Sequence, residues 1–195
     1  LPGCGVGVAI VDSGAAIAGA NFAAGSLRFV DAIEMTGGSL NGTVAQISSL
    51  PPLTLTAGTV TVTDTAENIA LLAFAEGNLA LVSGITVSGG ELRDTIAAIE
   101  ILSAPALSLA GGSLTAADTA ANILSADFTG PNLSQVNSIE LISGELLADV
   151  AKVESLPAIT LLGGSVRVAD TAAAIDAADF SSAKLQVVTG IDITS

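Results

Sequence analysis

An internal repeat constrains the fold of this chain more than any other feature of its sequence. Four segments align without a gap on an aspartate, and successive aspartates lie ~52 residues apart. The aligned residues are Asp12, Asp64, Asp118 and Asp170. Thr-Ala follows the last three and Ser-Gly follows the first. The chain therefore needs a fold in which the backbone path itself repeats.

Apolar residues recur at fixed offsets from each aspartate. Isoleucine stands five positions after it and phenylalanine ten positions after it in every copy. The aligned phenylalanines are Phe22, Phe74, Phe128 and Phe180. Large apolar side chains at one repeat position predict an internal row of rings that holds each unit on the core.

Each repeat divides into two halves of ~26 residues, in the order strand, glycine corner, strand, helix. We expect strands at 53–55, 60–62, 79–82, 85–87 and 191–195, and helices from Thr65 to Phe74 and from Glu91 to Leu102. Paired glycines mark the corners: Gly37-Gly38, Gly89-Gly90, Gly111-Gly112 and Gly163-Gly164.

Strand and helix alternating at this short period predict an α/β solenoid, with a parallel β-sheet on one side and short helices on the other. The chain would form a single repeat domain, 1–195, of about seven and a half coils. Its units are approximately 1–52, 53–106, 107–158 and 159–195. One coil could span ~26 or ~52 residues, and the similarity of the two halves favours the shorter coil.

Two resemblances accompany this pattern. Leu79, Val82, Ile85, Val87, Gly90 and Leu92 match the positions of a leucine-rich repeat, with glycine in place of its asparagine, as do the segments at 27–40 and 133–146. The Asp-Thr-Ala-x-Asn-Ile sequence resembles repeats of very large exported bacterial surface proteins. The resemblances imply a leucine-rich-repeat-like solenoid and an extracellular or cell-surface location.

Composition excludes several functions. The chain has no His, one Cys (Cys4), and 5 basic against 19 acidic residues, for a net charge of -14. Nucleic-acid binding needs a basic patch, and acid–base catalysis most often uses histidine. The five basic residues lie in scattered coils: Arg28, Arg93, Lys152, Arg167 and Lys184. We therefore expect no enzyme activity, no cofactor, no nucleic-acid partner and no membrane span.

The four aligned aspartates have two interpretations. As helix N-caps, their carboxylates would accept amide hydrogens of the first turn, and Asp64 with Glu67 resembles a capping box. As a ladder along one edge, Asp12, Asp64, Asp118 and Asp170 are candidate calcium ligands. The sequence has no aspartate-rich calcium-binding loop, which favours capping.

Alternation places one set of side chains on the outside of the sheet. This set comprises Glu34, Thr86, Glu140 and Asp192, with Ala9, Thr61, Thr115 and Arg167 in the other half-units. Protein-binding surfaces are rich in Tyr, Trp and Arg. The small, acidic, mixed face predicted here is therefore more typical of a solvated surface.

We expect a non-catalytic structural or interaction module, such as a surface-layer subunit, filament subunit or adhesin stalk. The apolar stretch Val6–Val11 and the apolar final strand could stack on another copy, head to tail, or on further repeats of a longer chain. The alternative is a calcium-binding module of a secreted protein.

Overall fold

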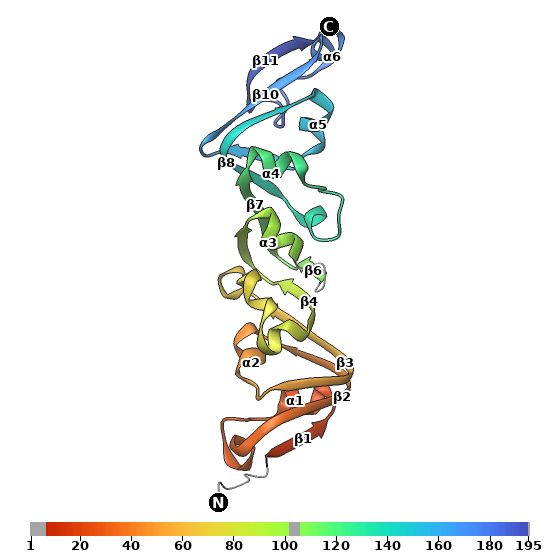
Figure 1. The fold of residues 1–195 in the computed structure, drawn as a ribbon, viewed down its shortest axis with the longest axis vertical. Coiled ribbons are helices and arrows are strands. Elements are labelled where there is room, and N and C mark those ends of the chain that lie inside the picture. Colours follow the sequence, from red (N-terminus) through yellow and green to blue (C-terminus); the bar gives the residue numbers. More distant parts are fainter. Residues whose placement is uncertain (1–6, 102–105, 195) are drawn as a thin grey trace, which may run out of the picture. The chain divides into compact units, whose positions relative to one another are not determined.

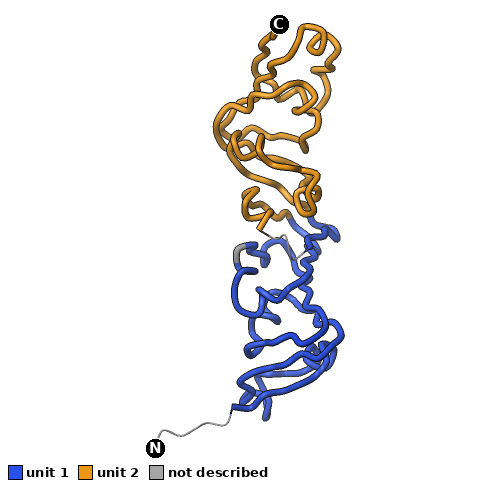
Figure 2. Tube along the Cα trace, turned by 45° about the vertical axis from the view of Figure 1, so that its right-hand side comes forward, with its two compact units in different colours: residues 1–90, 102–112 blue, residues 91–101, 113–195 orange. Residues whose placement is uncertain are grey.

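The computed structural model describes residues 7–101 and 106–194, so Cys4 and Val6 lie outside the described residues. The chain forms two compact units (Figure 2). Unit 1 comprises residues 1–90 and 102–112, and unit 2 comprises residues 91–101 and 113–195.

Unit 1 alternates strands with very short helices (Figure 1). Its strands are β1 (Val8–Asp12), β2 (Val30–Gly42), β3 (Leu53–Asp64), β4 (Val82–Val87) and β6 (Ala106–Leu109). Its α-helices are α1 (Gly14–Gly19) and α2 (Val44–Ser49). Its 3₁₀ helices are η1 (Gly25–Phe29), η2 (Ala66–Asn68), η3 (Leu71–Ala75) and η4 (Gly77–Leu81).

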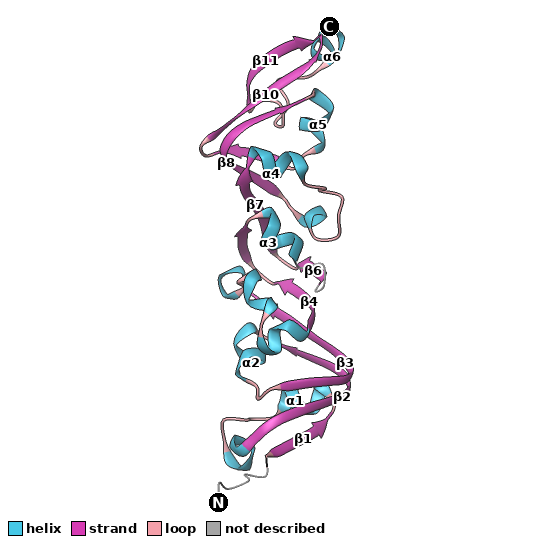
Figure 3. Ribbon diagram, viewed as in Figure 1, coloured by secondary structure: helices cyan, strands magenta, loops and turns pink. Residues whose placement is uncertain are grey.

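Unit 2 has the same alternation (Figure 3). Its strands are β5 (Gly90–Asp94), β7 (Gly112–Thr119), β8 (Ser138–Ala148), β9 (Ala158–Leu161), β10 (Gly164–Thr171) and β11 (Val188–Thr194). Its helices are α3 (Ile96–Ile101), α4 (Ala120–Ser125), η5 (Leu133–Gln135), α5 (Val150–Ser155) and α6 (Ala172–Ala177). In the described part of the chain, no helix is long and apolar enough to cross a membrane.

The strands of both units pair in parallel. In unit 1 the order is β1-β2-β3-β4-β6, and in unit 2 it is β5-β7-β8-β10-β11 with β9 also on β8. Consecutive parallel strands need a crossover, which the short helices supply. The predicted α/β fold with parallel strands is confirmed.

Several strands bend and change partners midway. Ser138–Leu141 of β8 pair with β7 and β9, whereas Gly144–Ala148 of the same strand pair with β10. In unit 1, both halves of β2 pair with β3, and only its first half pairs with β1. The second half of β3 then pairs with β4. A strand can therefore contribute to two successive groups of paired strands.

Paired residues lie closer in sequence than the expected coil of ~26 residues. Ile33 pairs with Leu53, 20 positions later, and Thr115 pairs with Ser138, 23 positions later. At each bend the chain passes from one group of paired strands to the next, so the residues after the bend add no further strand (rung) to the group that the chain leaves. The sequence separation of paired residues is therefore smaller than the ~26 residues of a half-unit.

The core consists of the inward aliphatic side chains of the strands and the apolar side of each helix. Val60, Val62, Val87, Ile139 and Leu141 are fully or almost fully buried. The strands here bury β-branched and leucine side chains on one face only, which produces the alternation seen in the sequence. Phe74 is buried with 6% exposure, but Phe22, Phe128 and Phe180 are partly exposed. The predicted row of four buried rings is therefore wrong at three positions.

Glycine is required where the chain bends between groups of strands. Gly58 has φ +99, and a Cβ there would lie 2.5 Å from the carbonyl oxygen of Gly38. A Cβ on Gly164 would lie 2.5 Å from Cγ of Leu141. The first position needs a left-handed backbone and the second a close approach between rungs. The prediction that glycines form the corners is confirmed.

Three expected elements differ. The expected helix from Thr65 to Phe74 is instead a series of 3₁₀ turns, η2 to η4, and η4 also replaces the start of the expected strand 79–82. The expected helix from Glu91 begins only at Ile96, because residues up to Asp94 form β5. Pairing of β5 with β7 outweighs the local helix propensity in this segment.

Candidate functional site

Three of the four repeated aspartates join neighbouring rungs within their units. One carboxylate oxygen of Asp64 accepts the amide of Val44, the first residue of α2, at 3.0 Å. Asp118 accepts the amide of Ile96, the first residue of α3, at 3.0 Å, and Asp170 accepts that of Val150, the first residue of α5, at 3.1 Å. Each carboxylate thus binds the amino end of a helix about one rung earlier in the chain.

The second oxygen of each carboxylate binds locally. In Asp118 it accepts the Thr119 amide at 2.8 Å and the Asn122 side-chain amide at 2.6 Å. Asp64 makes the same bonds with Thr65 and Asn68. Burial raises the pKa of the Asp64 carboxyl, but the hydrogen bonds from Asn68, Thr65 and Val44 together lower it by more. The pKa of Asp64 therefore lies below its ordinary value.

The predicted N-cap role of the aspartates is wrong by one residue. The N-cap residues are Ser13, Thr119 and Thr171 for α1, α4 and α6, and Thr65 for η2. Thr119 Oγ1, for example, accepts the amide of Asn122. The expected capping box at Asp64 and Glu67 is likewise replaced by one at Thr43 and Gln46. At Asp118 and Asp170 the threonine after the aspartate performs the capping, so the aspartate can bind another helix.

The calcium hypothesis required carboxylates that converge. Asp12, Asp64, Asp118 and Asp170 are not brought together, and the described residues contain no group of three acidic, histidine or cysteine side chains that could hold a metal. Calcium takes six to eight oxygen ligands, whereas the oxygens of Asp64, Asp118 and Asp170 accept backbone and side-chain N–H groups.

The carboxyl ends of α2 and α5 are also bound, which the sequence interpretation missed. The side-chain nitrogen of Asn78 donates to three backbone carbonyls at and just after the end of α2, at 3.0–3.3 Å, and its oxygen accepts the Leu53 amide. Lys184 donates to the carbonyl of Glu154 in α5 at 2.6 Å. Asn78 and Lys184 both stand fourteen positions after the repeated aspartate, and this shared position was the available signal.

The outer face of the sheet in unit 2 carries two ion pairs. Arg93 pairs with Glu140, and Arg167 pairs with Asp192. The hydrogen bond from Arg167 holds the pKa of Asp192 below its ordinary value. Glu34, Thr86, Glu140 and Asp192 are partly exposed, as predicted, but Thr115 is buried beneath a hydrogen bond to Glu91. The face is polar and internally paired, with no free cation among Arg93 and Arg167.

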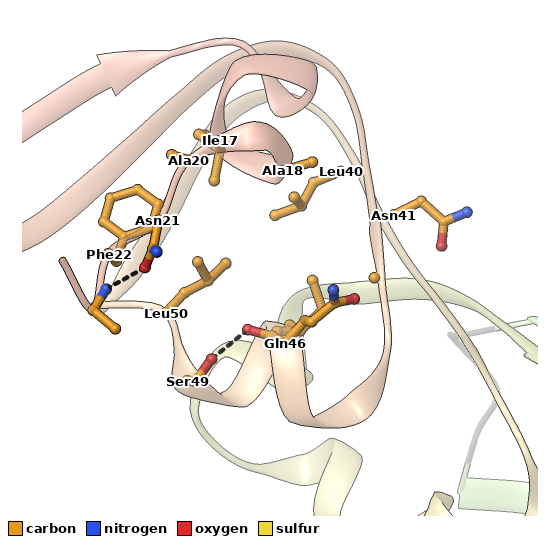
Figure 4. A pocket seen from close by; sticks show the side chains of 13 residues that line it. Ile17, Ala18, Ala20, Asn21, Phe22, Leu40, Asn41, Gln46, Ser49 and Leu50 are labelled. Atoms are coloured by element: carbon orange, nitrogen blue, oxygen red, sulfur yellow. Dashed lines mark hydrogen bonds between the residues drawn. The ribbon is translucent and has the colours of Figure 1, made fainter. Parts of the chain in front are cut away.

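A hollow of about 330 Å³ lies between α1 and α2 (Figure 4). Its apolar lining includes Phe22 and Leu50, and its polar lining includes Asn21, Gln46 and Ser49. The polar groups already serve local structure: Asn21 accepts the Ala23 amide, Gln46 completes the capping box, and Ser49 donates to the Gln46 carbonyl. The hollow therefore has the character of a gap between two helices.

Comparison with known proteins finds no matching family model, curated protein or solved structure.

Proposed function

We propose that this chain is a non-catalytic structural and interaction module: a rigid extracellular α/β solenoid that associates end to end through the open edges of β1 and β11. Such a module would serve as part of a surface layer, filament or adhesin stalk. The observation that carries the proposal is the exposure of aliphatic side chains on β1 and β11 at positions that are buried in the interior strands.

The connections between rungs support a rigid solenoid of about seven and a half half-units. Parallel pairing recurs along each unit at a sequence separation of 20 to 24 residues. Aspartates bind the helix starts at α2, α3 and α5, and Asn78 and Lys184 bind helix ends. Nearest-neighbour contacts of this kind are what stabilise repeat proteins.

The open strands support association at the ends. Among the described residues, β1 is paired only with β2, and β11 only with β10. Ile193 on β11 is 70% exposed and Val8 on β1 is 48% exposed, whereas the residues at the same repeat positions of interior strands, Val87 and Val60, have 0% exposure. Open apolar edges recruit further strands. The partner is a second copy, head to tail, or further repeats of the same polypeptide.

The side-chain inventory supports a role without catalysis. The sequence contains no histidine, and the repeated carboxylates are occupied in joining helices. Two of the five basic side chains are held in ion pairs. An acidic chain with one cysteine also suits an exported protein, as does the resemblance of its repeats to surface proteins.

Light scattering after size exclusion, with negative-stain electron microscopy, tests the proposal. We expect end-to-end chains that grow with concentration, and loss of these chains in the double variant Val8→Lys, Ile193→Lys. Leu162→Lys is the matched control, because Leu162 is 57% exposed but lies outside both edge strands. Parallel samples in millimolar calcium and in chelator test the alternative role. Monomers of 18.9 kDa at every concentration would refute self-association.

A further inference from the structure

We propose that the open edge of β11 binds an extended peptide of the pattern small–aliphatic–hydroxyl–leucine as an added parallel strand opposite Gly190–Ile193. The inference rests on the proposed function and specifies the partner of one of its two edges. Strand addition to an open sheet edge uses main-chain hydrogen bonds for affinity and alternate side chains for specificity.

Three internal strand pairs define the pattern. On β4, Ile85, Thr86 and Val87 pair with Leu107, Ser108 and Leu109 of β6. On β8, Ile139, Glu140 and Leu141 pair with Ile159, Thr160 and Leu161 of β9. On β2, Ile33, Glu34 and Met35 pair with Leu53, Thr54 and Leu55 of β3. In each pair the later strand (β3, β6 or β9) has the sequence aliphatic residue, hydroxyl residue, leucine. In β6 and β9 an alanine stands directly before the aliphatic residue.

β11 occupies the same repeat position as these three receiving strands. Ile191 stands at the same distance from its aspartate as Ile33, Ile85 and Ile139. Those three isoleucines are at most 1% exposed, whereas Ile191 is 44% exposed and Ile193 is 70% exposed. Among the described residues, β11 therefore lacks the second neighbouring strand that covers each of the three receiving strands.

The central side chain of the receiving strand also fits the pattern. Glu34, Thr86 and Glu140 each face a threonine or serine, and the hydroxyls of Thr86 and Ser108 are 3.0 Å apart. Asp192 is the corresponding residue on β11. Its oxygens bond to Arg167 but retain lone pairs for a hydroxyl donor. An acidic residue at this position of the peptide would instead meet a like charge.

A hollow lies beside β11 on the open end of unit 2. It has a volume of about 500 Å³ and is lined by Phe180, Leu185, Gln186 and residues Val188–Ile191. Phe180 remains partly exposed there. A strand added opposite Ile191 would lie beside this hollow, whose lining is both polar and apolar, so its aliphatic side chains would bury surface of both molecules.

Nuclear magnetic resonance of the labelled full chain tests the inference with a blocked peptide of the β9 segment, Ser-Leu-Pro-Ala-Ile-Thr-Leu-Leu-Gly. We expect saturable shift changes confined to the amides of Val188–Thr194, at millimolar peptide. The control peptide Ser-Leu-Pro-Ile-Ala-Leu-Thr-Leu-Gly has the same composition but the opposite alternation, and should bind at least tenfold more weakly. The variant Ile193→Thr should weaken binding at least fivefold, and Leu162→Thr should not.

Equal binding of the two peptides, shift changes outside β11, or no saturable change up to 10 mM peptide would each overturn the inference. The peptide result is independent of self-association. Specific peptide binding by a protein that stays monomeric would refute the end-to-end proposal and leave this inference standing. End-to-end chains without peptide binding at β11 would overturn this inference and leave the end-to-end proposal standing.

Discussion

Replacement of Asp118 tests whether the repeated aspartates stabilise the fold by joining rungs. Asp118 is 4% exposed and accepts three hydrogen bonds, from Ile96, Thr119 and Asn122. The Asp118→Ala variant would leave all three donors without this partner. Asp12 is the matched control, because its carboxylate accepts a single exposed hydrogen bond from the described residues, that of the Ser13 amide.

The expected magnitude follows from the three bonds. A hydrogen bond to a charged group contributes about 1.5–3 kcal/mol when buried, and less when water can replace it. The bond to Ile96 is buried, whereas Thr119 and Asn122 lie nearer to solvent. We therefore expect Asp118→Ala to lower the free energy of unfolding by about 3 kcal/mol, or Tm by about 6–12 °C in a chain of this size. Asp12→Ala should cost under about 1 kcal/mol.

Thermal melts by circular dichroism give the overall loss, and hydrogen exchange followed by mass spectrometry locates it. In Asp118→Ala, the segment Ile96–Ile101 should exchange faster, because its first amide has lost its acceptor. Asp118→Asn keeps one acceptor oxygen and should cost about 1–2 kcal/mol. If Asp118→Ala melts within 2 °C of Asp12→Ala and exchange at α3 is unchanged, the reasoning is refuted.

Three further predictions concern pH, packing and backbone. The folded-state pKa of Asp64 is lowered. The carboxylate therefore stabilises the fold fully above the unfolded pKa of about 4, and this stabilisation is lost as pH falls below that value through the folded-state pKa. In Asp64→Asn, the urea-unfolding midpoint should therefore fall less steeply with decreasing pH in the acid range. Phe74→Ala should cost about 3–5 kcal/mol and the partly exposed Phe22 about half as much, so equal melting losses would contradict the burial difference. Gly58→Ala should cost more than about 2 kcal/mol, because its Cβ would overlap a carbonyl, whereas Gly25→Ala, with open space around it, should cost about 1 kcal/mol in the same urea titration.

The fold class was predictable because its signals are local. Alternating β-branched residues predicted the strands around Val60 and Ile85, and paired glycines predicted corners such as Gly38. The change of partners along a bent strand was not predictable, since the first half of β8, which pairs with β9, and its second half, which pairs with β10, show no difference in sequence pattern that assigns their partners. Pairing at 20 to 24 residues therefore emerged only from the register.

Short helices limited the rest of the sequence interpretation. Segments 65–81 and 119–135 begin with the same Thr-Ala, yet the first forms 3₁₀ turns and the second begins with α4. Thr119 caps its helix, whereas Thr65 makes no capping bond. A helix of six residues has too few internal bonds to fix its own geometry. The hydrogen bond from the first residue of α2 to Asp64 could not be predicted, because the sequence around Asp64 does not show which helix lies beside it on the neighbouring rung.

The bonds of the repeated aspartates also determine how such a gene could lengthen or shorten. Each aspartate belongs to one half of the repeat and binds a helix of the other half. Deleting a single half would leave an aspartate without its helix or a helix without its aspartate, whereas deleting both halves together restores every pairing. Recombination between copies should therefore preserve folding only in steps of the whole repeat, which makes the double unit, and not the half, the heritable module of this protein.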